Sequence, residues 1–147
     1  RELKSKIRIP LVLAADEVIR KAEDPFAINL KGAADLVMLK VQPLGGIRRS
    51  LEIAEHHGLP VVVSSALESA VGIHYGLELA AAIENLTLDC GLATGSLMSA
   101  DVAQLHINNG AIALGDLDIK LDGLDVASDR YEWWKNRAMR CAEVLRI

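Results

Sequence analysis

Carboxylate, amine and hydroxyl side chains recur in this sequence at intervals of about 25 residues, each after a short apolar run. Asp16 supplies a carboxylate, Lys40 an amine, Ser64 and Ser65 two hydroxyls, and Gly91 a turn. A lysine beside a carboxylate suits proton transfer, stabilisation of a carbanion, or a hard metal ion held by the carboxylate. The alternative is an ordinary ion pair, which contributes at most ~1 kcal/mol where it is exposed. The residue types alone leave both interpretations open.

Lys40 is the principal catalytic candidate because of where it stands. The four apolar residues Leu36–Leu39 are typical of a strand buried on both faces, and Lys40 follows them directly. Gly45 and Gly46 then predict a tight turn, and a helical pattern begins at Ile47. In parallel α/β folds, catalytic residues lie at the carboxyl ends of strands, before such turns. We therefore expect Lys40 at the rim of an active site.

Strands and helices are expected to alternate along most of the chain. A βα repeat of this kind is typical of a parallel sheet. Right-handed crossovers would place the carboxyl ends of all its strands on one rim, where the chemical side chains would meet. The predicted strands are residues 11–15, 36–40, 60–63 and 86–88, and the predicted helices include residues 2–8, 26–31 and 47–57.

Residues 65–68 read Ser-Ala-Leu-Glu, the form of a capping box, and predict a helix that begins there. The N–H groups and the positive dipole end of such a helix would bind a carboxylate or phosphate of a ligand. Ser65 can cap the helix while Ser64 faces the ligand, so both roles stay open. A turn at Gly91 and Leu92 would likewise let a substrate approach the backbone closely.

The C-terminal part of the chain follows a different pattern. Asn109 and Gly110, between two apolar runs, predict a β-hairpin. Ser128 would begin a last helix with an amphipathic stripe. The stripe consists of Tyr131, Trp134, Ala138, Cys141 and Leu145. We interpret Trp133 and Trp134 as packing anchors, because a nucleic-acid platform would place basic residues on the same face.

The composition favours a globular protein and argues against several partners. Hydrophobic residues make up 51% of the chain and charged residues 24%, and the formal charge is −4. This acidic balance and the scattered basic residues argue against nucleic acid. No apolar run approaches the ~20 residues that span a bilayer, and no signal peptide is recognisable, so we expect a cytoplasmic protein without a membrane partner. Cys90 and Cys141 are interpreted as buried free thiols, and His56 and His57 as dipole partners of a helix end.

Four segments occur together in an order that resembles one known family. They are residues 15–17 (Ala-Asp-Glu), residues 35–46 around Lys40, residues 62–72 with the two serines, and residues 90–95 (Cys-Gly-Leu-Ala-Thr-Gly). The set resembles the C-terminal half of an enolase-superfamily barrel, and within that superfamily the o-succinylbenzoate synthases of actinobacterial type. The resemblance implies an α/β fold of parallel strands with alternating helices.

On this resemblance the chain divides into two parts. Residues 1–103 would form a half (β/α)-barrel that carries strands 5 to 8 of the parent barrel, and residues 104–147 would form a C-terminal hairpin and helix. The family's Lys-x-Lys pair and two further metal carboxylates have no match in this sequence. Asp16 alone cannot hold Mg²⁺ against water. We therefore expect the chain to be inactive alone and to need the remaining half of the barrel, in the same chain or a partner chain, which would also cover two open sheet edges.

The resemblance also implies a role for each chemical side chain. Asp16 matches a Mg²⁺ ligand, and Glu17 matches the acid behind it. Lys40 matches a catalytic lysine that stabilises an enediolate by its charge. Val18 stands where the family usually has a serine, so this sequence lacks a hydroxyl near the rim. The implied substrate-binding residues are Ser64, Ser65, Gly91 and Leu92.

The implied activity is that of a lyase in menaquinone biosynthesis. It would dehydrate a small-molecule carboxylate, 2-succinyl-6-hydroxy-2,4-cyclohexadiene-1-carboxylate, to o-succinylbenzoate through a Mg²⁺-stabilised enediolate. An N-acylamino-acid racemase or dipeptide epimerase of the same superfamily is one alternative. A non-catalytic half-barrel is another.

Overall fold

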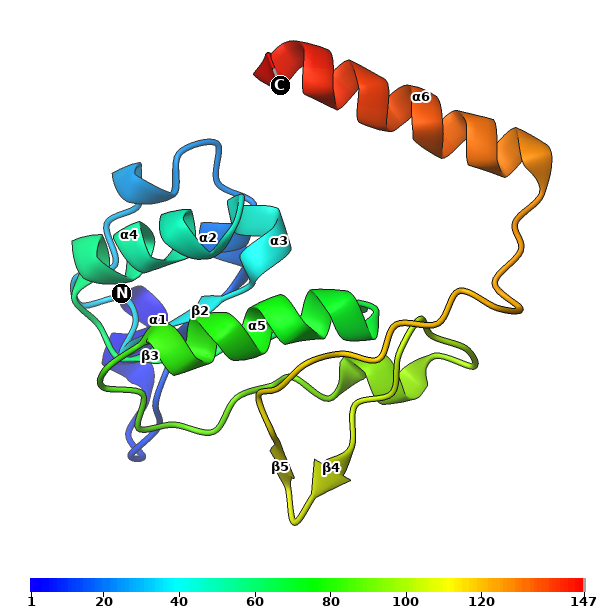
Figure 1. Ribbon diagram of the computed structural model, residues 1–147. Coiled ribbons are helices and arrows are strands. Elements are labelled where there is room, and N and C mark those ends of the chain that lie inside the picture. The colour runs from blue at the N-terminus through cyan, green and yellow to red at the C-terminus, as the bar shows by residue number, and fades with distance from the viewer. Residues whose placement is uncertain (147) are drawn as a thin grey trace.

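A parallel three-stranded sheet forms the centre of the computed structural model, which describes residues 1–146 (Figure 1). Its strands β1 (Ala14–Ala15), β2 (Leu36–Leu39) and β3 (Val61–Val63) lie side by side in sequence order. β1 pairs with β2, and β2 with β3, in parallel register. Each strand lies beside its predecessor, as in a βα repeat. Three of the four predicted strands are therefore confirmed, although β1 is shorter than expected.

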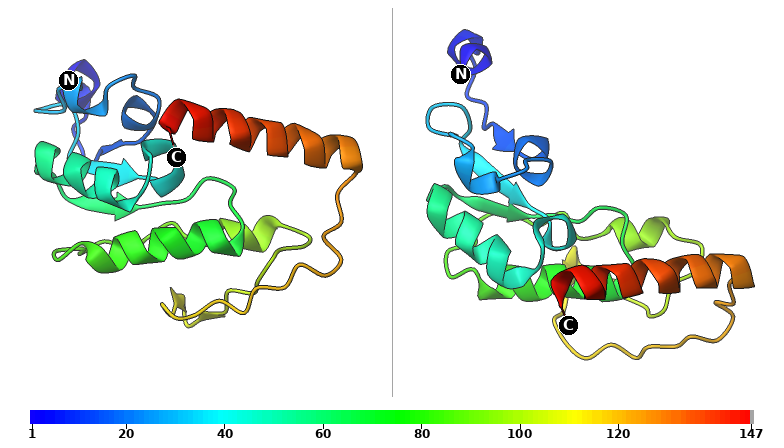
Figure 2. Two further views of the ribbon diagram at one scale, coloured as in Figure 1. Left: turned by 45° about the horizontal axis from the view of Figure 1, so that its top comes forward. Right: turned by 90° about the horizontal axis from the view of Figure 1, so that it is seen from above.

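A helix follows each strand. α2 (Glu17–Arg20) comes after β1, α3 (Val41–Leu44) and α4 (Ile47–His57) after β2, and α5 (Ala70–Ala82) after β3. α4 packs against β2 and α5 against β3, and Figure 2 shows these two helices lying side by side. The alternation confirms the expected α/β class. The shorter elements are α1 (Glu2–Lys6), where a helix over residues 2–8 was expected, and the 3₁₀ turns η1 (Pro25–Ala27) and η2 (Thr94–Leu97).

The hydrophobic core lies between the sheet and the helices. Side chains alternate between the two faces of a strand, so one face can be buried completely. Val37 and Leu39 of β2 and Val63 of β3 are fully buried, together with Ile53 of α4. Met38, on the opposite face of β2, is only half-buried. Residues 1–146 therefore cover one face of the sheet more completely than the other.

α4 has the predicted bounds because glycines mark both of its ends. It begins after Gly45 and Gly46, whose φ angles are +90° and +114°, and it ends at Gly58 with φ of +58°. Other residues would be strained at such angles. His57, in the last turn, lies with Nε2 3.1 Å from the carbonyl oxygen of Pro25, to which it donates. This histidine therefore fixes α4 to η1, and its expected role as a partner of the helix dipole stays a prediction.

The predicted strand over residues 86–88 is wrong. Within residues 1–146 this segment joins no sheet, and Gly91 instead forms a single parallel bridge with Ser64. The Gly91 N–H donates to the Val63 carbonyl at 2.9 Å, and the Ser65 N–H donates to the Gly91 carbonyl at 3.0 Å. The chain that leaves α5 reaches the sheet only beyond the end of β3, so one residue alone joins the ladder.

The helix predicted over residues 26–31 is a single 3₁₀ turn, η1. Asp24 caps this turn as the sequence indicates, since its carboxylate accepts the Phe26 N–H at 3.0 Å. The backbone is extended again at Ile28, and Leu30 enters the core two residues later. Burial of Leu30 takes the chain off the helical path, so tertiary packing shortens the element.

The capping box at residues 65–68 does not begin a helix. α5 begins at Ala70, and its N–H donates to the carboxylate of Asp101 at 2.7 Å. The Ser65 hydroxyl is bonded to the Gly91 carbonyl instead. The cap of α5 therefore comes from a distant part of the chain, which a local motif cannot reveal.

The C-terminal part contains the predicted hairpin and helix. β4 (Ile107–Asn108) and β5 (Ala111–Ile112) pair antiparallel around Asn109 and Gly110, both of which have positive φ. Such a turn suits an Asn-Gly pair. α6 (Ser128–Leu145) stands apart from the sheet and its helices, and none of its residues is buried (Figure 1). Neither α6 nor another helix within residues 1–146 is long and apolar enough to cross a membrane.

The expected packing of α6 is not found among residues 1–146. Trp133 and Trp134 are about half exposed and contact each other, with ring centroids 4.7 Å apart, while the Arg130 guanidinium lies 5.3 Å from the Trp133 ring. The interpretation of the two tryptophans as packing anchors is therefore wrong for this part of the chain. Cys90 and Cys141 are free, as expected, but Cys141 is exposed and Cys90 only half-buried.

Asp35 ties the N-terminal segment to the start of β2. One carboxylate oxygen accepts the Leu13 N–H at 3.0 Å, and the other is paired with the ammonium of Lys4. Lys4, and with it the Leu13 N–H, lowers the pKa of Asp35 below its ordinary value. A carboxylate with a depressed folded-state pKa stabilises the fold above its ordinary pKa, and this contribution is lost as the pH falls through the folded-state value.

We predict that Asp35→Asn lowers the free energy of unfolding at neutral pH, because the amide forms no ion pair with Lys4. Denaturant titrations should show a difference from the unchanged protein that is full above about pH 5 and decreases as the pH falls below about 4, the ordinary pKa of an aspartate. The matched control is Asp116→Asn, at an exposed carboxylate in a loop, which should change little. A difference that is independent of pH would contradict the assignment.

Candidate active site

Asp16 and Lys40 form an ion pair at the carboxyl ends of β1 and β2. Lys40 Nζ donates to both carboxylate oxygens of Asp16, each at 2.8 Å. The Lys40 side chain is 12% exposed and that of Asp16 is 31% exposed. Charge-assisted hydrogen bonds that are partly shielded from water are stronger than exposed ones. The two residues expected to meet on the rim therefore do meet.

The starts of two short helices direct both side chains to the rim. Asp16 precedes α2, and its carbonyl accepts the N–H groups of Ile19 and Arg20 at 3.0 and 3.1 Å. Its carboxylate is turned away from the helix, toward Lys40. Lys40 precedes α3 with an extended backbone. The backbone thus fixes the positions of both residues, and their charged groups are free to bond to each other.

Asp16 lies among further charges on α2. Glu17 forms ion pairs with Arg20 and Lys21, and these two cations lower the pKa of Glu17 to about 2. Glu17, and more weakly Asp16, raise the pKa of the Arg20 guanidinium. Nothing in the local sequence pattern marks Arg20, which adds a second positive charge near Asp16. The Glu17 carboxylate faces its own helix, and its expected place behind Asp16 stays a prediction.

The two serines after β3 differ in what their hydroxyls contact. Ser65 is buried, donates to the Gly91 carbonyl at 3.0 Å and lies 2.8 Å from the Thr94 hydroxyl. Ser64 is half-buried, and its hydroxyl lies 3.5 Å from the carbonyl oxygens of Ser65 and Gly91, which is too long for strong hydrogen bonds. The Ser64 hydroxyl is thus the more available to a ligand. Substrate binding by either serine stays a prediction.

Gly91 approaches Ser64 closely because it has no side chain. A Cβ atom at Gly91 would lie 3.1 Å from the Ser64 hydroxyl oxygen. Leu92 is buried in the core beside Gly76 of α5, where a Cβ atom would lie 2.7 Å from Leu92 Cδ2. Gly91 therefore lies on the rim, whereas the Leu92 side chain lies in the hydrophobic core. Contact of either residue with a substrate stays a prediction.

Glu68 is a second carboxylate near Lys40. Burial raises the pKa of Glu68, while the Ala66 N–H, 3.4 Å away, and the charge of Lys40 act against this rise. Gln42, two residues after Lys40, donates to the Gly72 carbonyl at 2.9 Å and so ties α3 to α5. In the sequence, Glu68 reads as the last member of a capping box, which concealed its position near the rim.

Magnesium requires about six oxygen ligands in a near-octahedral array. At this rim, both oxygens of Asp16 are bonded to Lys40. Among residues 1–146, no group of three or more His, Cys, Asp or Glu side chains could hold a metal ion. The residues of this chain therefore do not fit a magnesium site by themselves.

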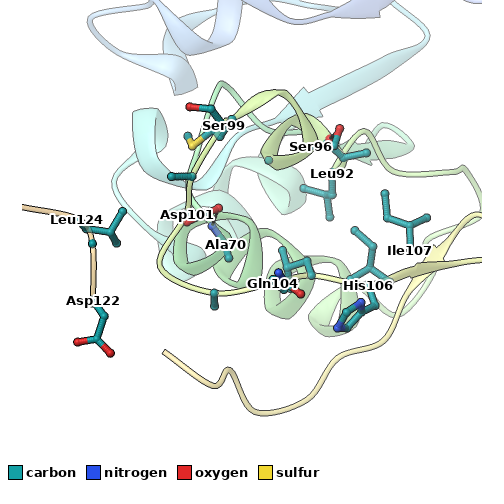
Figure 3. A pocket seen from close by; sticks show the side chains of 18 residues that line it. Ala70, Leu92, Ser96, Ser99, Asp101, Gln104, His106, Ile107, Asp122 and Leu124 are labelled. Carbon is teal, nitrogen blue, oxygen red and sulfur yellow. Dashed lines mark hydrogen bonds between the residues drawn. The ribbon is translucent and has the colours of Figure 1, made fainter. Parts of the chain in front are cut away.

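A cavity of about 490 Å³ lies beside these residues but does not contain the ion pair. Figure 3 shows its lining, which includes Ala70 at the start of α5, Leu92 and Asp101. Neither Asp16 nor Lys40 contributes to it. Asp101 already serves as the cap of α5. The best candidates for chemistry therefore remain at the strand ends.

Residues 1–119 match the family of enolase C-terminal domain-like proteins. Over 148 aligned residues, the chain is 48% identical to the o-succinylbenzoate synthase of Mycobacterium ulcerans (strain Agy99) and 45% identical to that of Mycobacterium tuberculosis (strain ATCC 25618 / H37Rv). Each alignment covers 98% of this chain and 45% of the relative. The chain therefore spans slightly less than half the length of these relatives, and the resemblance stated from its motifs is confirmed.

Three solved structures are similar to this chain in fold, each at 25% identity. N-succinyl Arg/Lys racemase from Bacillus cereus ATCC 14579 matches with a TM-score of 0.66 over 82% of this chain and 34% of that protein. Muconate lactonizing enzyme from Pseudomonas putida matches with 0.63, over 75% and 32%. The L-Ala-D/L-Glu epimerase from Bacillus subtilis matches with 0.59, over 77% and 32%. These matches confirm the expected parallel α/β fold.

We predict that Asp16 and Lys40 are energetically coupled. Asp16→Asn and Lys40→Gln, made singly and together, form a double-mutant cycle whose coupling in unfolding free energy should be about 1–3 kcal/mol. The reason is that each single change leaves a partly buried charge without its partner. Denaturant titration of the four proteins measures the coupling.

The pair Asp118 and Lys120 is the matched control. Its charged atoms lie 2.9 Å apart, but its side chains are 82% and 72% exposed. The same cycle should give less than about 0.5 kcal/mol there, because water screens the pair. A coupling between Asp16 and Lys40 no larger than in this control would show that the pair is not a fixed part of the rim.

Proposed function

The chain belongs to the enolase C-terminal domain-like family, and on this premise we propose that it supplies half of the active site of a lyase that forms o-succinylbenzoate. The substrate would be 2-succinyl-6-hydroxy-2,4-cyclohexadiene-1-carboxylate, and the reaction would serve menaquinone biosynthesis in the cytoplasm. The mycobacterial relatives support this proposal. The observation that carries it is the ion pair of Lys40 and Asp16 at the ends of adjacent parallel strands.

Lys40 provides a fixed positive charge in the proposed reaction. Removal of the proton next to the substrate carboxylate produces an enediolate, so negative charge develops on the carboxylate oxygens. A preorganised ammonium beside these oxygens stabilises that charge as it develops. The contact with both oxygens of Asp16 and the low exposure of Lys40 hold the ammonium in place. The base that removes the proton and returns it to the departing hydroxyl would come from the rest of the barrel.

Asp16 is proposed as one of three carboxylates that together would bind Mg²⁺. The other two would come from the rest of the barrel, because the residues of this chain do not fit the ion by themselves. Glu17 is engaged in ion pairs with Arg20 and Lys21. On this proposal Asp16 would be the ligand at the strand end, and Glu17 would lie behind it.

The succinyl carboxylate of the substrate is proposed to bind at the edge formed by Ser64, Ser65, Gly91 and Leu92. Among residues 1–146, the Ser64 hydroxyl has only contacts of 3.5 Å, so it can turn to donate to a carboxylate oxygen. The bare backbone of Gly91 permits close approach of the ligand. Ser65 and Leu92, both buried, would shape this edge from behind.

The remaining half of the barrel is proposed to come from the same chain or a partner chain. β1 lies at an edge of the sheet, and sheet edges pair readily with further strands. Ile9, Leu11 and Val12, which precede β1, are each more than half exposed. Added strands would cover these apolar side chains. Residues 1–103 would then be the half-barrel and residues 104–147 its extension, with neither nucleic acid nor membrane as a partner.

A racemase or epimerase is the second candidate function, because two of the similar structures carry those names. In that case Lys40 would itself transfer protons. A lysine held by both oxygens of Asp16 suits a fixed charge better than a mobile proton carrier. A non-catalytic half-barrel is the third candidate, and measurable turnover would exclude it.

We predict that Lys40→Ala in the assembled barrel lowers kcat for dehydration by about 10²–10³-fold, the cost of removing one preorganised group that stabilises developing charge. Lys40→Arg keeps the charge and should retain part of the rate of a lyase. A racemase that uses Lys40 as a base should lose turnover in both variants. Product formation and exchange of the substrate α-hydrogen with deuterated solvent measure the two activities separately.

Lys120→Ala is the matched control, since Lys120 is an exposed lysine with an acidic neighbour away from the rim. Its activity should equal that of the unchanged protein. Equal dehydration rates in Lys40→Ala and Lys120→Ala would remove Lys40 from the proposed reaction.

A further inference from the structure

Thr94 joins the loop that follows β3, with Ser64 and Ser65, to the loop that follows Gly91. We call the part of the site formed by these two loops the hydroxyl edge. Its hydroxyl lies 2.8 Å from the Ser65 hydroxyl and donates to the Ala66 carbonyl at 2.5 Å. Thr94 can therefore only accept from Ser65, which is 7% exposed and shares its single hydroxyl proton between the Thr94 oxygen and the Gly91 carbonyl, 3.0 Å away. Thr94 is thus the one side chain of the loop after Gly91 that bonds, within residues 1–146, to both residues following Ser64.

These hydroxyl contacts matter because few backbone bonds hold the two loops together. The segment before Gly91 forms no strand within residues 1–146, so the ladder beyond β3 consists of the single bridge between Ser64 and Gly91. Two backbone hydrogen bonds make this bridge, one donated by Gly91 and one by Ser65. The pair of hydroxyls from Ser65 and Thr94 therefore supplies side-chain bonds comparable in number to the backbone bonds.

The distance between Ser64 and Gly91 depends on this bridge. A Cβ atom at Gly91 would lie 3.1 Å from the Ser64 hydroxyl oxygen, so the two loops approach more closely than an ordinary contact with a Cβ atom would allow. Ser64 itself adds only contacts of 3.5 Å. A loop that is held by so few bonds would open away from its neighbour more often when one hydroxyl partner is lost.

We propose that Thr94 is a positioning residue, whose hydroxyl holds the Ser64–Gly91 edge in the geometry that binds the far carboxylate of the substrate. This role rests on the proposed function, because that function places a carboxylate at this edge. Thr94 acts through Ser65 and the Ala66 carbonyl, at the opposite end of the site from the Asp16–Lys40 pair. It therefore governs substrate affinity rather than the chemical step.

Thr94→Val tests this role, because valine has the shape of threonine without the hydroxyl. We expect hydrogen exchange of the Gly91 and Ser65 amides to become about fivefold to tenfold faster, the effect of losing one net hydrogen bond from a local opening equilibrium. Exchange at Val37, in the core strand β2, should not change. Thr94→Ser, which keeps the hydroxyl, should restore slow exchange.

Ser96→Ala is the matched control, since in the described part of the chain the Ser96 hydroxyl bonds only within its own turn, to the Ala93 carbonyl at 2.7 Å. It should leave exchange at Gly91 unchanged. Faster exchange in this control as in Thr94→Val, or faster exchange at Val37 as well, would overturn the proposal, because the effect would then be a general loss of stability.

Steady-state kinetics of the assembled barrel give the second measurement. Thr94→Val should raise KM for the succinyl substrate about fivefold to tenfold and leave kcat within about twofold, since binding is lost equally in the ground state and the transition state. Thr94→Ser should restore KM. An unchanged KM in Thr94→Val would overturn the positioning role. Absence of dehydration in the unchanged protein would instead overturn the proposed function, while the exchange data would still decide whether Thr94 holds the two loops.

Discussion

The short parallel ladder of β1, β2 and β3 determines where the candidate residues lie. Parallel strands place their carboxyl ends side by side, so Asp16, Lys40 and Ser64 follow one another along one rim. The ladder contains only two residue pairs between β1 and β2 and three between β2 and β3. Its register depends on burial, because a shift of one residue would turn Val37 and Leu39 away from the helices. The same shift would turn Lys40 away from the rim. The register that buries the core side chains therefore also sets the geometry of the site.

The site has two edges that are held by different forces. At the charged edge, Asp16 and Lys40 are fixed by helix starts and by their mutual contact at 2.8 Å. At the hydroxyl edge, a single backbone bridge at Gly91 and the side chains of Ser65 and Thr94 hold two loops together. Chemistry requires a fixed charge, whereas recognition of a flexible substrate arm tolerates a more adaptable contact. The proposed reaction centre at Lys40 and the proposed recognition site at Ser64 and Gly91 would each need the kind of edge at which they lie.

Local signals were sufficient to predict the elements that local forces determine. The apolar run of β2, the lysine that follows it and the glycine that ends α4 were all predicted from their own neighbourhoods. The errors arose where distant groups compete with a local motif. The Ser65 hydroxyl bonds to the Gly91 carbonyl instead of capping a helix. The cap of α5 comes from the carboxylate of Asp101, not from the predicted capping box. The position of Glu68 near Lys40 was concealed for the same reason, since a capping-box pattern cannot show which tertiary partner its members find.

Charge balance explains how a carboxylate that is proposed as a metal ligand can be part of a stable structure. An unpaired carboxylate in a partly buried position is costly, but Asp16 and Lys40 neutralise each other. A divalent cation added to this neutral pair would leave two net positive charges at the rim. Further carboxylates from the rest of the barrel would remove that excess, which is why metal binding and completion of the barrel should be coupled. The ion pair thus gives this half of the barrel a stable rim before assembly, and under the proposed function it would supply one metal ligand and one catalytic charge afterwards.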